Sequence, residues 1–201
     1  MDLRIANEIE LPKFGQFTPY QKWLVRLADS DYIAARLLWY LTPLYPQVLS
    51  KSHEAIEKYL KLLYVLLAKV PDSDADLELK KTFRHDLKKL REHCAQFARD
   101  ETRIQIGIAG RSFVAYIEFL DTANYGMVAR YPNTYAFPGN VIRIVDSVIH
   151  TLRNWCLQIE FSPVQTVTEQ FRAVEGWPTP NPEIVSVAFH YQNERYTKAS
   201  V

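Results

Sequence analysis

Hydrophobic residues recur at intervals of three and four positions over most of this chain, the spacing that places them on one face of a helix. The clearest stretch is 52–67, whose apolar face is made by Ala55, Ile56, Tyr59, Leu60, Leu63, Leu66 and Leu67. Pro46 and Pro71 flank this stretch, and proline is tolerated at the start of a helix but not inside it. The pattern therefore predicts a long amphipathic helix from about Pro46 to just before Pro71.

A second long helix is predicted to begin at Thr18. Thr18 can cap it, Pro19 takes the first helical position, and Gln21 can complete a capping box. The helix should run to about Leu41, because the residue before Pro43 is biased away from helical geometry. Its apolar stripe contains Trp23, Leu24, Leu27, Ala34, Ala35, Leu38 and Leu41, whereas three charged residues fall mostly off it, namely Asp29, Asp31 and Arg36.

Further helices are predicted after Pro71. The acidic stretch 72–76 is predicted to be a solvated loop with helix-capping aspartates, and 77–83 to form one or two helical turns. The last long helix follows a cap at Asn140 and runs from Val141 to about Ile159, whereas Gly107, Gly110 and residues 125–139 interrupt the helical pattern. The three helical faces are Leu87, Leu90, Cys94 and Phe97; Phe113, Ile117, Leu120 and Asn124 between Ser112 and Gly126; and Ile142, Val145, Val148, Ile149, Leu152, Trp155, Cys156 and Ile159.

Both ends of the chain show the two-residue alternation that is typical of β-strands. The alternating apolar positions are Leu3, Ile5, Ile9 and Leu11 near one end and Val185, Val187, Phe189 and Tyr191 near the other. The proline-rich residues 177–182 favour an extended segment. We therefore expect an N-terminal arm or strand over 1–17, a helical domain over 18–160 and a proline-rich, extended segment over 161–201. The ends either form a two-stranded ribbon or lie separately against the helices, with a disordered N-terminal arm as the alternative.

Composition narrows the function only a little. The 24 lysines and arginines nearly balance 23 aspartates and glutamates, so the whole chain carries no charge signature for nucleic acid or a membrane surface, although local patches stay open. No apolar run approaches the roughly 20 residues of a membrane helix. The charged N-terminus lacks the apolar region of a signal peptide, so we expect a cytoplasmic protein without a membrane association.

The sequence predicts no metal and no cofactor. Cys94 and Cys156 are expected to be buried, reduced thiols, because no close Cys/His pairing surrounds them. His53 and Glu57 lie one helical turn apart, but two further ligands are missing. Residues 72–76 lack the glycine and the distant glutamate of an EF-hand.

Four segments stand in order between residues 28 and 159. They are an alanine- and aspartate-containing helix over 29–41, then Ala55-Ile56-Glu57-Lys58-Tyr59-Leu60-Lys61, then His85-Asp86-Leu87 with Leu90, and finally Ala129-Arg130-Tyr131-Pro132-Asn133. This order resembles the HEPN family, small helical domains of prokaryotic toxin–antitoxin and defence systems. The resemblance implies an all-α fold, an up-and-down bundle of four to five helices, often assembled as a homodimer. One position departs from the family, because Arg84 stands where a small residue, often Thr or Gly, usually precedes His-Asp-Leu.

The matched residues also have ordinary structural roles. Glu57 and Lys61 are four apart and can pair along a helix surface. Asp86 can satisfy free amides at a helix start, and His85 can pack and hydrogen-bond within the bundle.

The resemblance further implies a catalytic pair. Active family members carry an arginine followed, after four to six residues, by a histidine on the last long helix, and Arg143 and His150 match this arrangement. Seven positions make nearly two turns, so both side chains leave the same side of the helix, with Asp146 and Asn154 expected in support near that stripe. Arg143 can clamp a phosphate and His150 can move a proton at neutral pH.

Such a protein would be a metal-independent endoribonuclease. A ribose 2′-hydroxyl of the RNA substrate would attack the adjacent phosphate at a cleft shared by two protomers. Two other functions stay open. A non-catalytic HEPN module would bind a nucleotide in its helical groove, with Lys61 and Arg130 as phosphate contacts, or would pair with a small nucleotidyltransferase. A purely structural dimer would use the aromatic-rich ends for assembly.

Overall fold

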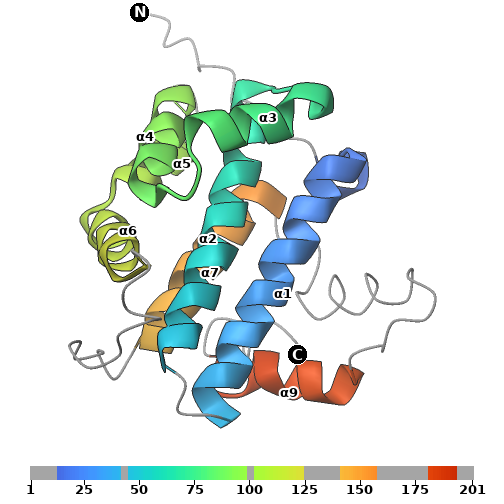
Figure 1. Ribbon diagram of the computed structural model, residues 1–201, viewed down its shortest axis with the longest axis vertical. Coiled ribbons are helices and arrows are strands. Elements are labelled where there is room, and N and C mark those ends of the chain that lie inside the picture. The colour runs from blue at the N-terminus through green and yellow to red at the C-terminus, as the bar shows by residue number, and fades with distance from the viewer. Residues whose placement is uncertain (1–12, 42–44, 99–101, 125–140, 158–180, 194–201) are drawn as a thin grey trace, which may run out of the picture.

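The computed structural model describes residues 13–41, 45–98, 102–124, 141–157 and 181–193. Within these residues the fold is all-α, with eight α-helices packed against one another and no strand, so the predicted fold class is confirmed, although the helices outnumber the four to five expected (Figure 1). In order, the elements are a 3-10 turn at Phe14–Gln16, α1 (Pro19–Leu41), α2 (Tyr45–Ala68), α3 (Asp72–Thr82), α4 (Leu87–Phe97), α5 (Thr102–Ala109), α6 (Arg111–Asn124), α7 (Val141–Leu157) and α9 (Pro182–His190). None of these helices is both long and apolar enough to cross a membrane.

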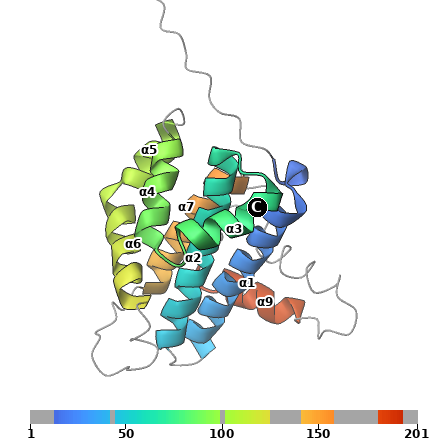
Figure 2. The ribbon, with the colours of Figure 1, turned by 45° about the horizontal axis from the view of Figure 1, so that its top comes forward.

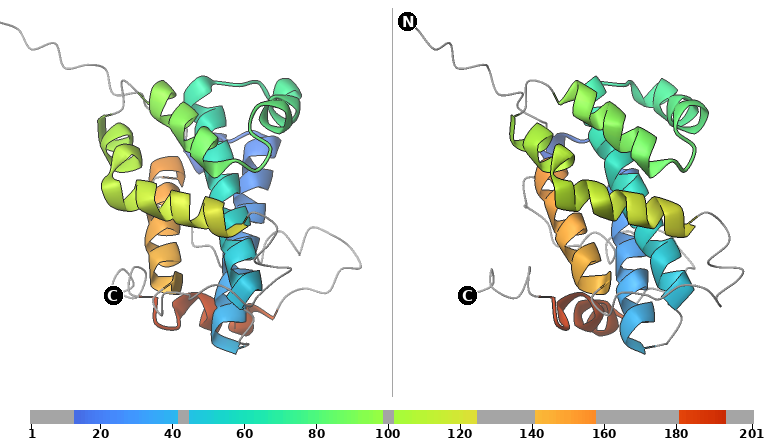
Figure 3. Two further views of the ribbon diagram at one scale, coloured as in Figure 1. Left: turned by 60° about the vertical axis from the view of Figure 1, so that its left-hand side comes forward. Right: turned by 90° about the vertical axis from the view of Figure 1, so that its left-hand side faces the viewer.

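Helix α2 is the centre of the fold. It runs antiparallel to α1, packs on α7, and carries α4 and α6 on the side away from α1 (Figure 2). Because α2 has neighbours on several sides, residues outside its predicted apolar face, such as Leu62 and Val65, are buried as well. Figure 3 shows α6 crossing the α2–α7 pair on one side and α9 lying beneath the lower ends of α1 and α7.

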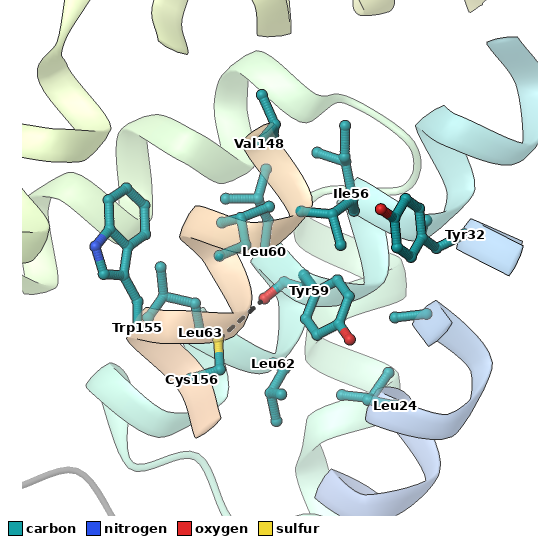
Figure 4. Packing of buried hydrophobic residues seen from close by; sticks show 14 of the residues in the cluster. Leu24, Tyr32, Ile56, Tyr59, Leu60, Leu62, Leu63, Val148, Trp155 and Cys156 are labelled. Atoms are coloured by element: carbon teal, nitrogen blue, oxygen red, sulfur yellow. Dashed lines mark hydrogen bonds between the residues drawn. The ribbon is translucent and has the colours of Figure 1, made fainter. Parts of the chain in front are cut away.

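Both cysteines pack against α2 in the core, Cys156 from α7 and Cys94 from α4. Trp155 and Cys156 of α7 pack close to Leu60 and Leu63 of α2 (Figure 4). The Cys156 thiol lies 3.8 Å from the carbonyl oxygen of Tyr59, and the Cys94 thiol lies 3.4 Å from that of Leu60. Both cysteines are buried and free, as predicted, and burial raises the pKa of each thiol.

The predicted start of α1 is confirmed. The Thr18 amide donates to Oε1 of Gln21 over 3.1 Å, and the Gln21 amide donates to Oγ1 of Thr18 over 3.2 Å, which completes the capping box. The Thr18 hydroxyl also donates to Asp72 over 2.7 Å. The expectation of a loop over 72–76 is wrong, because these residues form the first turns of α3, where aspartates stabilise the positive end of the helix dipole.

Gly107 lies inside α5 and does not end a helix. A Cβ atom at Gly107 would lie 2.2 Å from Cζ2 of Trp155, far inside van der Waals contact. The glycine therefore lets α5 pack directly against the indole on α7. Gly110 marks the short break between α5 and α6.

The strand predicted over 185–191 is wrong, because these residues belong to α9 and its end. Asn181 caps the helix by accepting from the Glu183 amide over 2.9 Å, and Pro182 occupies its first turn. Val185, Ala188 and Phe189 are buried, and their spacing of three and four residues follows the helix face that packs on α1. The strand predicted over 3–11 and residues 177–180 lie outside the described residues.

A buried ion pair joins α7 to α1 and α9. Arg36 pairs with Asp146, and the same guanidinium donates to the carbonyl oxygens of Ala188, over 2.6 Å, and of Tyr191. The Tyr32 hydroxyl donates to Asp146 over 2.7 Å. We call these five residues the Arg36 cluster. It satisfies both buried charges, as charges away from water require.

A second buried ion pair joins α7 to α1 and α2. Arg153 pairs with Asp29 and also donates to the Tyr59 hydroxyl over 2.7 Å, while that hydroxyl donates to Asp29. Asp29 and Arg36 are fully buried, although the sequence placed both mostly off the packed stripe of α1. Both residues are buried because α2, α7 and α9 together cover more of α1 than its predicted apolar stripe.

Candidate functional site

The two predicted catalytic residues and their two supporting residues all lie on α7. Arg143, His150 and Asn154 are at least partly exposed, whereas Asp146 lies on the buried face. Arg143 is exposed and His150 is half-buried. Nδ2 of Asn154 lies 3.3 Å from Nδ1 of His150, so these two side chains are neighbours, as predicted. Asp146 does not share their face, because it is buried in the Arg36 cluster. The expectation that Asp146 supports Arg143 and His150 from the polar stripe is therefore wrong.

The two motifs on α2 and before α4 meet at Glu57. Its carboxylate pairs with Lys61 and hydrogen-bonds with Nδ1 of His85 over 3.0 Å. Burial alone would raise the pKa of Glu57, but the attraction of Lys61 and the hydrogen bonds from Lys61 and His85 outweigh burial and hold that pKa below its usual range. Glu57 is therefore an ionised carboxylate held at a fixed position between two elements.

His53 lies one turn before Glu57 and is almost fully buried. Its Nδ1 lies 3.7 Å from Glu57 and its Nε2 lies 3.9 Å from Asp121 on α6. Burial lowers the pKa of His53 to about 4 despite the pull of Glu57, so the imidazole is neutral at pH 7 and neither contact is an ion pair there. Burial also raises the pKa of Asp121, which accepts a hydrogen bond from the Leu87 amide over 3.2 Å.

Two hollows adjoin at these histidines, because His53 and His85 line both of them. The first, which we call the aromatic hollow, has a volume of about 460 Å³ and lies between α1, α2 and α3. The second, which we call the turn hollow, has a volume of about 590 Å³ and lies at the turn between α3 and α4. Each is within the size range of small-molecule sites, roughly 300–1,000 Å³.

The aromatic hollow offers a ring-stacking surface without excess charge. Tyr20 and Trp23 line it with their ring centroids 5.6 Å apart, and Trp23 is 46% exposed. The lining lysines are each paired with a carboxylate: Lys58 with Asp31, Lys61 with Glu57, and Lys80 with Asp76. This hollow therefore suits a flat, mostly neutral group that can stack on an indole.

The turn hollow is different in charge. Its wall carries three cations, Lys81, Arg84 and Lys89. Its two carboxylates are occupied by α4 amides, because Asp86 accepts from Lys89 over 2.7 Å as the predicted cap of α4 and Asp121 accepts from Leu87. The wall therefore carries three cations against two carboxylates, and each carboxylate is engaged by an α4 amide and not by one of the cationic side chains.

Sequence reasoning found part of this site. It identified Glu57, Lys61 and His85, and the predicted Glu57–Lys61 pair is confirmed. Arg130, the other predicted phosphate contact, lies outside the described residues. Trp23 was assigned to the packed stripe of α1, but it is half-exposed.

The described residues contain no group of three or more His, Cys, Asp or Glu side chains arranged to hold a metal ion. Comparison of the chain with protein-family models, curated proteins and solved structures gives no match in any of the three.

Proposed function

We propose that this chain is a HEPN-like binding module that takes a nucleotide where its Glu57–Lys61 and His85–Asp86 motifs meet. The observation that carries the proposal is the shared boundary of the two hollows at His53 and His85. A nucleotide combines a flat ring with a charged phosphate chain. The aromatic hollow offers rings on which a base can stack, and the turn hollow offers cations that can bind phosphate. The proposal assigns binding and no reaction.

Equilibrium dialysis with labelled ATP tests this proposal. We expect saturable binding to the wild-type chain and roughly 5- to 150-fold weaker binding to Trp23→Ala, because stacking of one base contributes about 1–3 kcal/mol. Phe97→Ala is the matched control, since Phe97 is similarly exposed and lies outside the lining of both hollows. Equal ATP affinity in all three proteins, or no binding to any, would refute the proposal.

The family resemblance also implies assembly with partners. A homodimer, or a complex with a small nucleotidyltransferase of a toxin–antitoxin or defence system, would fit a module of this kind. Light scattering of the purified chain measures the first. Co-purification with nucleotidyltransferases encoded next to the gene tests the second.

A second candidate function is a metal-independent ribonuclease that uses Arg143 and His150. The hydrogen-bond distance between Asn154 and His150 favours it, because a fixed imidazole is a better proton carrier. The test is cleavage of a structured RNA in chelator, with His150→Ala beside a control at the exposed His190→Ala. If wild type and His150→Ala leave the RNA equally intact, this candidate is rejected.

A further inference from the structure

We propose that the turn hollow is the phosphate subsite of the chain and that Arg84 is its principal contact. The ligand class is a nucleoside diphosphate or triphosphate whose ring occupies the aromatic hollow. This inference rests on the proposed nucleotide binding for the ring, but the phosphate subsite has observations of its own.

The first observation is the availability of the cations. Arg84 and Lys81 line the hollow, and neither side chain makes a hydrogen bond or ion pair within the part of the chain that the structure describes. Lys89 donates to the carbonyl oxygen of Thr82 over 2.7 Å, which orients the ammonium group but leaves its charge in place. These three cations therefore stand ready for an anion, whereas the lysines of the aromatic hollow are already paired.

The second observation is the backbone of Arg84. Its φ is 51°, in the left-handed region that glycine adopts freely and other residues adopt at a cost. The Phe83 and Arg84 amides both donate to the Leu79 carbonyl, over 3.1 Å and 3.3 Å, so the turn itself requires this conformation. The same left-handed conformation occurs at Lys69 after α2, so it is an ordinary way to end a helix, and at the end of α3 it places Arg84 at the wall of the hollow.

The third observation is that the two hollows are adjacent. His53 and His85 line both, so the cations of the turn hollow lie on the other side of these two residues from the aromatic hollow. The guanidinium of Arg84 matches a phosphate oxygen pair in a bidentate manner, and Lys81 and Lys89 can bind the remaining oxygens as point charges. The ring of the ligand thus lies against aromatic side chains, and its phosphate chain lies against cations.

Isothermal titration calorimetry tests the inference with three probes: ATP, inorganic tripolyphosphate and adenosine. The key variant is Arg84→Gly, which removes the guanidinium and lets the turn keep its left-handed geometry without strain. The matched control is Lys69→Gly, because Lys69 is also an exposed cation with positive φ, at 54°, and lies outside the lining of the hollow. Circular dichroism of each variant confirms that the fold is kept.

We expect ATP and tripolyphosphate to bind the wild type and Lys69→Gly equally, and to bind Arg84→Gly at least tenfold more weakly. Adenosine should bind wild type and Arg84→Gly equally. If Arg84→Gly binds ATP as tightly as the wild type, the phosphate subsite is refuted while the proposed nucleotide binding stands. If tripolyphosphate binding depends on Arg84 but Trp23→Ala leaves ATP binding unchanged, the subsite stands and the proposed function fails. Absence of binding by all three probes refutes both.

Discussion

Replacing Arg36 with Met should lower the free energy of unfolding by about 3–5 kcal/mol at pH 7, because the Asp146 carboxylate would be left buried without its cation. That is a large fraction of the roughly 5–15 kcal/mol that stabilises a typical domain. The carbonyl oxygens of Ala188 and Tyr191 would also lose their donor. Amide hydrogen exchange should therefore show the greatest loss of protection in α9.

Asp146→Asn should destabilise by a similar amount at pH 7 but should respond differently to pH. Burial raises the pKa of Asp146, so in Arg36→Met the folded state takes up a proton at Asp146 before the unfolded state does. Acidification from pH 7 towards the folded-state pKa therefore restores stability to Arg36→Met. Asp146→Asn leaves an arginine that cannot lose its charge, so no such recovery occurs.

Urea denaturation followed by far-UV circular dichroism, at pH 7 and at about pH 5, measures both effects. Taking the difference between Arg36→Met and Asp146→Asn at each pH removes the titration of groups that both variants share. The double variant Arg36→Met/Asp146→Asn should be more stable than either single variant, because no charge stays buried. A loss below about 1 kcal/mol for Arg36→Met, or strictly additive single losses, would show that the Arg36 cluster does not hold α7, α1 and α9 together.

Three further predictions concern single positions. The pKa of His53 is lowered to about 4, so the unfolded chain binds a proton below about pH 6.5, whereas the folded chain does so only near pH 4. The free energy of unfolding should therefore fall by up to about 3 kcal/mol as the pH is lowered across that window. His53→Gln should flatten this fall, unlike the exposed control His190→Gln. Gly107→Ala should cost about 1–3 kcal/mol in thermal or urea unfolding by forcing Trp155 to move, whereas Gly15→Ala, which meets no atom within 4 Å, should be neutral. Lys69→Gly should stabilise by about 0.5–1 kcal/mol in the same measurement, since it relieves a positive φ at the end of α2; an unchanged or lower midpoint would contradict that reason.

Much of the helical framework was predictable from local signals. The capping box at Thr18, the cap at Asp86 and the three- and four-residue spacing in α2 depend on residues within a few positions of one another. The alternation in 185–191 misled, because Val and Phe are compatible with both a strand and a packed helix. The cap at Asn181 and the proline after it decided for α9.

The site was half predictable for the same reason. Glu57 and Lys61 pair within one helix, so their spacing alone indicated the contact. The contact between Glu57 and His85 joins residues 28 positions apart and depends on how the α3–α4 turn returns to α2. Arg84 was noticeable in the sequence as a departure from the family pattern, but its positive φ belongs to the folded turn.

The amino-acid sequence by itself determined that this chain is helical and where most helices begin, because caps, prolines and apolar spacing act over one or two turns. Tertiary structure alone decided which charged residues are interior. Asp29, Arg36, Asp146 and Arg153 look like surface residues until α1, α2, α7 and α9 come together around them. These charges can be buried only because each pairs with a partner on another helix, and no local sequence pattern indicates that contact.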